Sequence, residues 1–228
     1  MSQLSLNLIA ISVFVITMMS LLGPLIDLSP FVPAIAVASL LGLATLDTFS
    51  WQGKGSTLLL DWLARFSADH RARVVRHEAG HFLVAQRLGI PVTGYTLSAW
   101  EAFKQGQSGL GGIQFDTQEL DAELQQGKLP AQLLDRYCTI WMAGAAAENL
   151  VYGDVQGGAD DRQTLNAVLT QLPLSLTERE QKERWSALRA KNLLQENWST
   201  YEALVTALEQ RASVETCNQI LEQQTAVE

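Results

Sequence analysis

Residues 67–91 read SADHRARVVRHEAGHFLVAQRLGIP, and this stretch decides how the rest of the chain is interpreted. The pattern predicts a single helix over Ala68–Leu88. Ser67 is a favoured residue for capping the start of a helix, whereas Gly89 followed by Pro91 is typical of a helix end. Apolar residues recur at helical spacing within the stretch, so one face of this helix is expected to point into a folded domain.

The same helix carries two histidines four residues apart, within His77-Glu78-Ala79-Gly80-His81. Residues i and i+4 lie one turn apart on the same helix face, so both imidazoles can bind one metal ion. This is the H-E-x-x-H pattern of zinc peptidases. There the zinc lowers the pKa of its water from about 15.7 towards 7, and Glu78 is the expected general base. The alternative is a helix with two structural histidines.

A catalytic zinc takes three protein ligands and a water, so a third ligand must come from elsewhere in the chain. His70 is the one other histidine, and it precedes His77 by about 10 Å along the helix at 1.5 Å per residue. It cannot reach the same ion, and a carboxylate or a cysteine is expected instead. Iron also accepts two histidines and a carboxylate, so zinc is the expected metal but not the single candidate.

The first 53 residues contain no Lys or Arg and are strongly apolar. Residues 6–26 are long and apolar enough for a membrane-spanning helix, and residues 28–46 form a second, shorter apolar run. We therefore expect residues 1–50 to be a transmembrane hairpin of two spans. One span followed by a buried or re-entrant helix is the alternative. A cleaved secretory signal fits less well, because its basic first region is missing.

Basic residues resume directly after the second apolar run, at Lys54, Arg65, Arg71, Arg73 and Arg76. By the positive-inside rule, the domain that follows is expected on the cytoplasmic side, or on the stromal or matrix side of an organelle. Residues 51–66 are expected to be a juxtamembrane linker with an amphipathic segment, and residues 67–228 to be the main domain.

The overall charge and the two cysteines indicate which partners and which redox compartment to expect. The formal net charge is −8, which repels phosphate backbones, so no nucleic-acid partner is expected. Cys138 and Cys217 form no C-x-x-C pair, and two ordinary thiols in a reducing compartment are the expected reading.

The rest of the domain reads as mainly helical with one small sheet. A strand is predicted over residues 92–100, with a short return strand over residues 113–115 after a glycine-rich stretch. Thr177 and Glu180 have capping-box spacing and are expected to begin a helix. The predicted helices cover residues 131–151, 159–172, 177–197 and 201–211.

Four pieces of the sequence resemble, in order, the peptidase domain of FtsH-type membrane proteases. The HEAGH of residues 77–81 is the first, and the glycine-rich hairpin through Gly111-Gly112 falls where that family has a substrate-binding strand. Residues 142–153, MAGAAAENLVYG, resemble the family's (A/S)GRAAEEL helix and the IFG or VFG after it. Residues 157–161, GGADD, resemble its TGASND segment.

This resemblance covers roughly residues 67–212 and implies a helical, zincin-like peptidase fold that holds one Zn2+ per chain and acts on proteins or peptides. It implies Asp161 as the third zinc ligand, although a slip of one residue would select Asp160. Glu148 matches a family carboxylate beside the metal, where it would accept the other N–H of a histidine ligand. Gly111 and Gly112 would bind substrate backbone by strand addition.

The chain also departs from this family. FtsH-type proteases carry an ATP-driven unfoldase between membrane and peptidase, but here residues 47–66 alone separate the second apolar run from the expected domain. Gly53-Lys54-Gly55-Ser56 lacks the upstream glycine and loop of a G-x-x-x-x-G-K-[ST] motif, so no ATP binding is expected. The resulting prediction is an ATP-independent, membrane-anchored zinc metalloendopeptidase. A homo-oligomer or a partner ATPase stays open.

Two other functions compete with this prediction. One is a catalytically weak or inactive membrane adaptor or assembly factor, which could work with a separate ATPase. The other is an intramembrane protease with H-E-x-x-H inside a spanning helix. The expected helix carries Arg71, Arg73, Arg76 and Arg87, and each central Arg costs about 2.5–3.5 kcal/mol to insert, which argues against the second alternative.

Overall fold

The computed structural model describes residues 3–50, 55, 67–106, 111–126 and 129–225. It separates into two compact units, Met1–Ser67 and Ala68–Glu228. The described residues are mainly helical, with one two-stranded antiparallel sheet. The predicted mainly helical fold with one small sheet is therefore confirmed. Apart from residue 55, the predicted linker over residues 51–66 lies outside the described residues.

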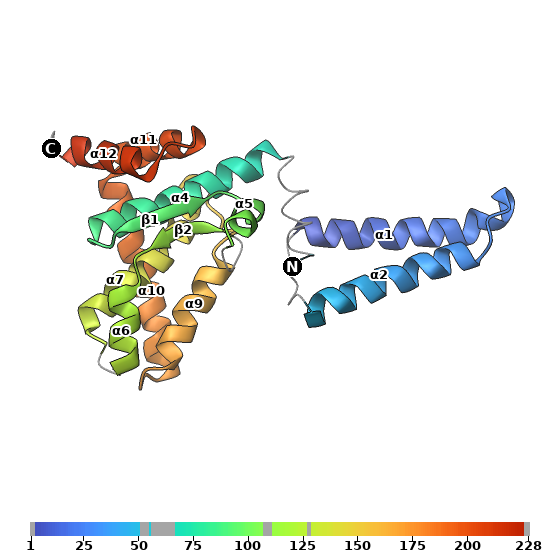
Figure 1. Ribbon diagram of the computed structural model, residues 1–228, viewed down its shortest axis with the longest axis horizontal. Coiled ribbons are helices and arrows are strands. Elements are labelled where there is room, and N and C mark those ends of the chain that lie inside the picture. Colours follow the sequence, from blue (N-terminus) through green and yellow to red (C-terminus); the bar gives the residue numbers. More distant parts are fainter. Residues whose placement is uncertain (1–2, 51–54, 56–66, 107–110, 127–128, 226–228) are drawn as a thin grey trace. The chain divides into compact units, whose positions relative to one another are not determined.

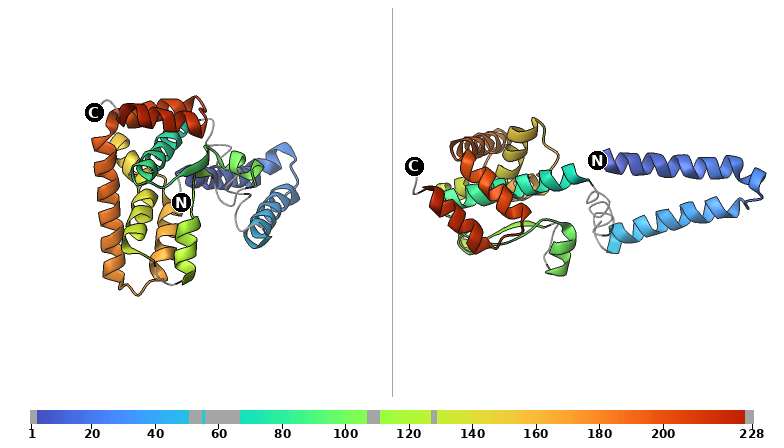
Figure 2. Two further views of the ribbon diagram at one scale, coloured as in Figure 1. Left: turned by 60° about the vertical axis from the view of Figure 1, so that its left-hand side comes forward. Right: turned by 90° about the horizontal axis from the view of Figure 1, so that it is seen from above.

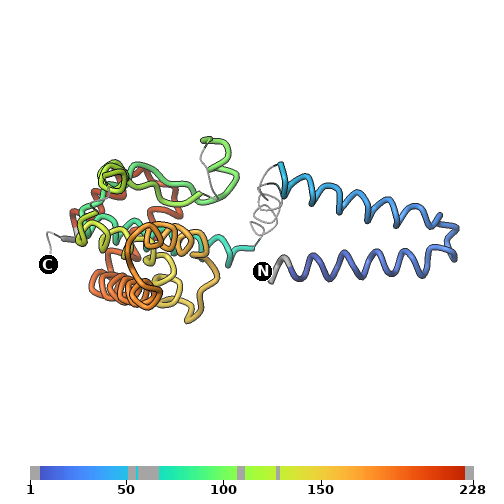
Figure 3. The backbone as a smooth tube through the Cα atoms, turned by 90° about the horizontal axis from the view of Figure 1, so that it is seen from below, coloured from blue at the N-terminus to red at the C-terminus, as the bar shows by residue number. Residues whose placement is uncertain are grey.

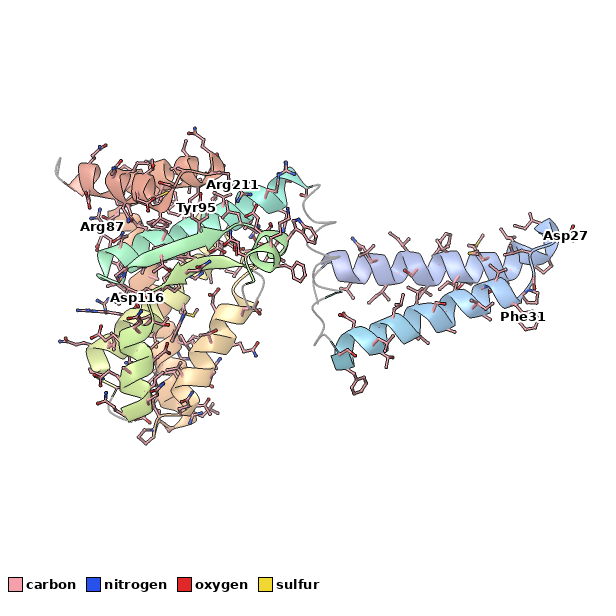
Figure 4. All side chains as sticks on the ribbon, in the orientation of Figure 1. Asp27, Phe31, Arg87, Tyr95, Asp116 and Arg211 are labelled. Atoms are coloured by element: carbon pink, nitrogen blue, oxygen red, sulfur yellow. The ribbon has the colours of Figure 1, made fainter. Side chains whose placement is uncertain are left out.

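The first unit is a pair of apolar helices (Figure 1). Helix α1 (Gln3–Leu22) continues into the short 3-10 helix η1 (Gly23–Ile26), and α2 (Phe31–Ser50) runs back beside it (Figure 3). Asp27 follows η1, and Phe31 begins α2 at the same end of the pair (Figure 4). The segments Leu6–Ile26 and Phe31–Ser50 are both long and apolar enough to cross a membrane, and most of their large apolar side chains are exposed.

The second unit is built around helix α4 (Ala68–Arg87), which ends one residue before the predicted end. Its side chains Phe82 and Leu83 are fully buried. The helices α7 (Ala131–Trp141), α8 (Ala143–Tyr152), α10 (Leu176–Glu196) and α11 (Trp198–Glu209) pack against it. Both strands of the sheet run beside it (Figures 1 and 2). Because α4 lies in the middle of the unit, the face that carries the two histidines is enclosed by segments from distant parts of the sequence.

Strand β1 (Val92–Thr96) pairs with β2 (Gly112–Phe115), with Tyr95 opposite Ile113. The prediction that β1 continues to residue 100 is wrong. The chain instead forms a short helix, α5 (Ala99–Lys104), because the Ser98 side chain accepts a hydrogen bond from the Glu101 N–H and caps it. Ser98 and Glu101 have capping-box spacing, a helix-start signal that outweighs the β-forming residues around it.

The predicted helix over residues 131–151 is in fact two helices, α7 (Ala131–Trp141) and α8 (Ala143–Tyr152). They meet at Met142, whose φ of −87° and ψ of −4° lie at the edge of the α-helical region, close to the bridge region. A helix that ends leaves the carbonyls of its last turn without intrahelical partners. This break therefore frees backbone oxygens of α7 for tertiary contacts.

The remaining helices complete the unit. The capping box of α10 is formed by Ser175 and Glu178, not by Thr177 and Glu180 as predicted, so the helix begins slightly earlier. Ser175 has the extended backbone that a cap requires. Tyr95 on β1 donates a hydrogen bond to the Ala212 carbonyl at 2.6 Å, beside Arg211 (Figure 4). The helices are α6 (Gln118–Gln126), α9 (Ala159–Thr170), α10 (Leu176–Glu196), α11 (Trp198–Glu209) and α12 (Val214–Thr225).

Candidate metal centre

Three ligand atoms from two helices converge beside α4. The Nε2 atoms of His77 and His81 are 3.0 Å apart. Asp161 Oδ2, from the first turn of α9, lies 3.2 Å from the first nitrogen and 3.4 Å from the second. Ligands about 2.0–2.1 Å from a tetrahedral zinc are themselves roughly 3.3 Å apart. The three atoms thus have the mutual spacing of zinc ligands, and this group could hold a metal ion.

Each imidazole is oriented by a second partner on its other nitrogen. His77 Nδ1 lies 2.7 Å from Glu148 Oε1 on α8, and His81 Nδ1 lies 2.8 Å from the carbonyl of Ile140 in the last turn of α7. A carboxylate and a carbonyl can only accept, so in the neutral imidazoles both Nδ1 atoms carry the proton. Both Nε2 atoms are then lone-pair donors to a metal, as in histidine ligands generally.

The donor set therefore fits a cation. Two imidazole lone pairs and one carboxylate oxygen face the same point, and neutral imidazoles place no hydrogen among them. Three such acceptors in a largely buried position repel one another unless a positive charge lies between them. Two nitrogens and one carboxylate oxygen form a set that zinc accepts and that leaves a fourth position for water or substrate.

The electrostatics of the site favour a positive charge at the same point. Burial opposes the charged form of His77, but the protonated ring can donate to both Asp161 and Glu148, and this raises its pKa to about 10. Burial likewise works against the charged form of Asp161, yet His81 and His77 hold the pKa of its carboxyl well below the ordinary value. Both shifts favour a positive charge between the imidazoles and the carboxylate.

Small residues let this arrangement form. A Cβ on Gly144 would lie 2.2 Å from His77 Nε2, and one on Gly157 would lie 2.5 Å from Glu148 Oε1. Real Cβ contacts are essentially never shorter than 3.0 Å. The absence of side chains at these positions therefore lets α8 and the loop before α9 reach the histidine rings.

Glu78 lies next to the ligand cluster and faces the sheet. Its Oε2 accepts a hydrogen bond from the backbone N–H of Ile113 on β2 at 2.9 Å. A Cβ on Gly112 would lie 3.2 Å from the same oxygen, and Gly112 has a φ of +122°, which L residues rarely adopt. Desolvation raises the pKa of the Glu78 carboxyl, while His77 and His81 oppose this shift. The start of β2 thus holds the carboxylate in place.

The structure brings most of the sequence-predicted site residues together. His77, His81 and Asp161 form the cluster, Asp160 is exposed outside it, and Glu148 contacts His77. Gly112 lies against Glu78, whereas Gly111 packs near Thr96 and Ser98 instead.

Other contacts of the site were missed by the sequence reasoning. Arg73 donates to Glu148 at 2.9 Å, Ile140 contributes its carbonyl, and Gly144 makes room for His77. Arg73 has the same four-residue spacing from His77 as His81 has, and this was the signal that could have found it. Gly144 lies within the MAGAAAENLVYG stretch of the family resemblance, which was its signal, whereas the Ile140 carbonyl carries none.

Comparisons with known proteins do not assign the chain to a family. No protein-family model matches the chain, and no curated protein matches it. The likeness to FtsH-type peptidases therefore rests on the four sequence pieces.

Proposed function

We propose that this chain is a membrane-anchored zinc metalloendopeptidase that hydrolyses peptide bonds without ATP. The observation that carries the proposal is the convergence of His77 Nε2, His81 Nε2 and Asp161 Oδ2, with Glu78 beside them. A structural ion-pair cluster needs no further carboxylate next to it. A hydrolytic site needs both a metal position and a base.

The residues divide the chemistry among them. Zinc, when bound, supplies a Lewis acid that makes water nucleophilic at neutral pH. His77, His81 and Asp161 would hold it. Glu78 would accept the proton of the attacking water and return it to the leaving amine, the two tasks of a general base that then acts as an acid. The Ile113 N–H keeps this carboxylate oriented for both tasks.

The substrates proposed are extended segments of proteins or peptides. The start of β2, at Gly112 and Ile113, touches the general base directly. An extended peptide that added to this small sheet would pass along the site, which is how strand addition presents a backbone. The two apolar helices would keep the peptidase at a membrane, on the side that the basic residues after them favour.

The experiment is zinc binding and peptide cleavage by the full chain in detergent micelles, compared with Glu78→Gln. The variant is expected to hold zinc as tightly as the wild type and to lose cleavage by about 100-fold or more, in line with general-base contributions of 10²–10⁴. Glu202→Gln is the matched control, because Glu202 pairs with Arg76 away from the cluster, and it should cleave normally.

Each other outcome has a definite meaning. Cleavage by Glu78→Gln at the wild-type rate would refute the mechanism. Zinc binding by a wild type that cleaves no peptide would support the membrane adaptor instead. A wild type that binds no metal would refute the proposed centre itself.

A further inference from the structure

Arg73 contacts two residues beside the proposed metal centre, Glu148 and Asp154. It lies one helical turn before His77 on α4, and its side chain is 15% exposed. One guanidinium nitrogen donates to Glu148 Oε2 at 2.9 Å, and the other donates to Asp154 Oδ1 at 2.9 Å. Its guanidinium carbon also lies 4.1 Å from the centre of the Tyr152 ring, within cation–π range.

The carboxylate that Arg73 contacts is buried, and both of its oxygens accept hydrogen bonds. Glu148 is 1% exposed, and it accepts hydrogen bonds from His77 Nδ1 and from the backbone N–H groups of Gln156 and Gly157. Among its described partners, Arg73 alone carries a permanent positive charge. A buried carboxylate without a charged partner is costly, so Arg73 stabilises Glu148 as the acceptor that His77 requires.

Arg73 also fastens the loop that leads to the third ligand. Residues 153–158, here termed the ligand loop, connect α8 to α9, which begins two residues before Asp161. Arg73 bonds the side chain and the carbonyl of Asp154, and Glu148 bonds Gln156 and Gly157. The Arg73–Glu148 pair thus holds both ends of this loop against α4, the helix that carries the two histidines.

We propose that Arg73 is a positioning residue of the metal centre: through Glu148 it orients His77, and through the ligand loop it sets Asp161 at the distance that a zinc ion requires. Neither the expected motif nor the family resemblance assigns this role. The inference rests on the proposed zinc site but not on peptide cleavage, because its measurements are made on zinc and cobalt binding.

The test compares Arg73→Gln with Arg76→Gln in the full chain in detergent micelles. Arg76 is the matched control, three residues further along α4, and pairs with Glu202 at 2.8 Å. Loss of an outer partner of a metal ligand costs about 10–100-fold in metal affinity. Arg73→Gln is therefore expected to weaken zinc binding by that factor and to alter the visible spectrum of bound Co2+, whereas Arg76→Gln changes neither.

Two further variants separate positioning from simple folding. Arg73→Lys keeps the charge beside Glu148 but lacks the planar fork that reaches Asp154 as well, so it should restore part of the zinc affinity. Asp154→Asn alters a carboxylate that is 55% exposed, so the fold should survive, with zinc binding weakened less than by Arg73→Gln.

The proposal is overturned if Arg73→Gln binds zinc like the wild type. If that variant does not fold, Asp154→Asn decides: zinc affinity equal to that of the wild type overturns the positioning role, and a reduced affinity supports it. An inactive wild type that still binds zinc would refute the peptidase without touching this inference, so the two failures can be told apart.

Discussion

Replacing Gly144 with alanine should disrupt the proposed metal centre while leaving the helices in place. The added methyl carbon would lie 2.2 Å from His77 Nε2, 2.4 Å from Cδ2 and 2.5 Å from Cε1. All three atoms belong to the ring that is expected to bind the metal, and the closest is the binding nitrogen itself.

The size of the effect follows from these distances. Non-bonded heavy atoms pack at about 3.5–4.0 Å, so the ring must move by more than about 1 Å. It has little freedom to do so, because Nδ1 is held by Glu148 and the His81 ring centroid lies 4.8 Å away. Metal sites tolerate about 0.2 Å in ligand distances, so His77 is lost as a ligand. We expect overpacking to cost about 1–3 kcal/mol of stability.

The assay is competition for zinc between the full chain and a chromophoric chelator, in detergent micelles, with circular dichroism as a check on folding. Loss of an outer partner alone costs about 10–100-fold in affinity, so loss of a direct ligand should exceed the upper value. Gly42→Ala is the matched control, since a Cβ there meets nothing within 4 Å. It should bind zinc normally.

One result would refute the reasoning. A folded Gly144→Ala protein with wild-type zinc affinity would mean that His77 is not a ligand, or that the approach of α8 to α4 differs from the one described. A protein that fails to fold would show instead that the contact between α8 and His77 matters to the fold as a whole.

Two further predictions concern the base and the metal. Gly112→Ala should lower peptide cleavage and leave zinc affinity unchanged, because its Cβ would crowd Glu78 and the φ of +122° strains an L residue. A zinc titration and a kinetic assay test this, and an equal loss of zinc affinity and of cleavage would contradict it. Removing zinc with a chelator should lower the melting temperature, since a ligand at 100 times its dissociation constant stabilises the folded state by about 2.7 kcal/mol. An unchanged melting curve would contradict binding to the folded chain.

Some of the fold could be predicted because its signals are local. Helix α4 was predicted over residues 68–88 and is observed over Ala68–Arg87, since a glycine and a nearby proline stop it whatever surrounds it. The two apolar helices follow from composition in the same way. The predictions failed where two local signals compete, as at Ser98, where a helix cap outweighs residues that favour a strand.

Parts of the site depend instead on packing between distant segments. The break at Met142 leaves the last-turn carbonyl of Ile140 to accept from His81. Whether α8 approaches α4 closely enough for Gly144 to touch His77 is settled by the whole core. Arg73 likewise contacts Glu148 across 75 residues of sequence, and no sequence periodicity predicts a contact between residues so far apart in the chain.

The sequence by itself determined that His77 and His81 share one helix face beside Glu78, because the helical period places residues four apart one above the other. The resemblance to a family pointed to Asp161 and Glu148 as companions. Tertiary structure alone decided that Asp161 Oδ2 meets both nitrogens within 3.4 Å and that Glu148 orients the first of them. The physical reason is that a spacing of four residues is set by backbone geometry, whereas a meeting across 84 residues is set by how α8, α9 and their connecting loop pack against α4.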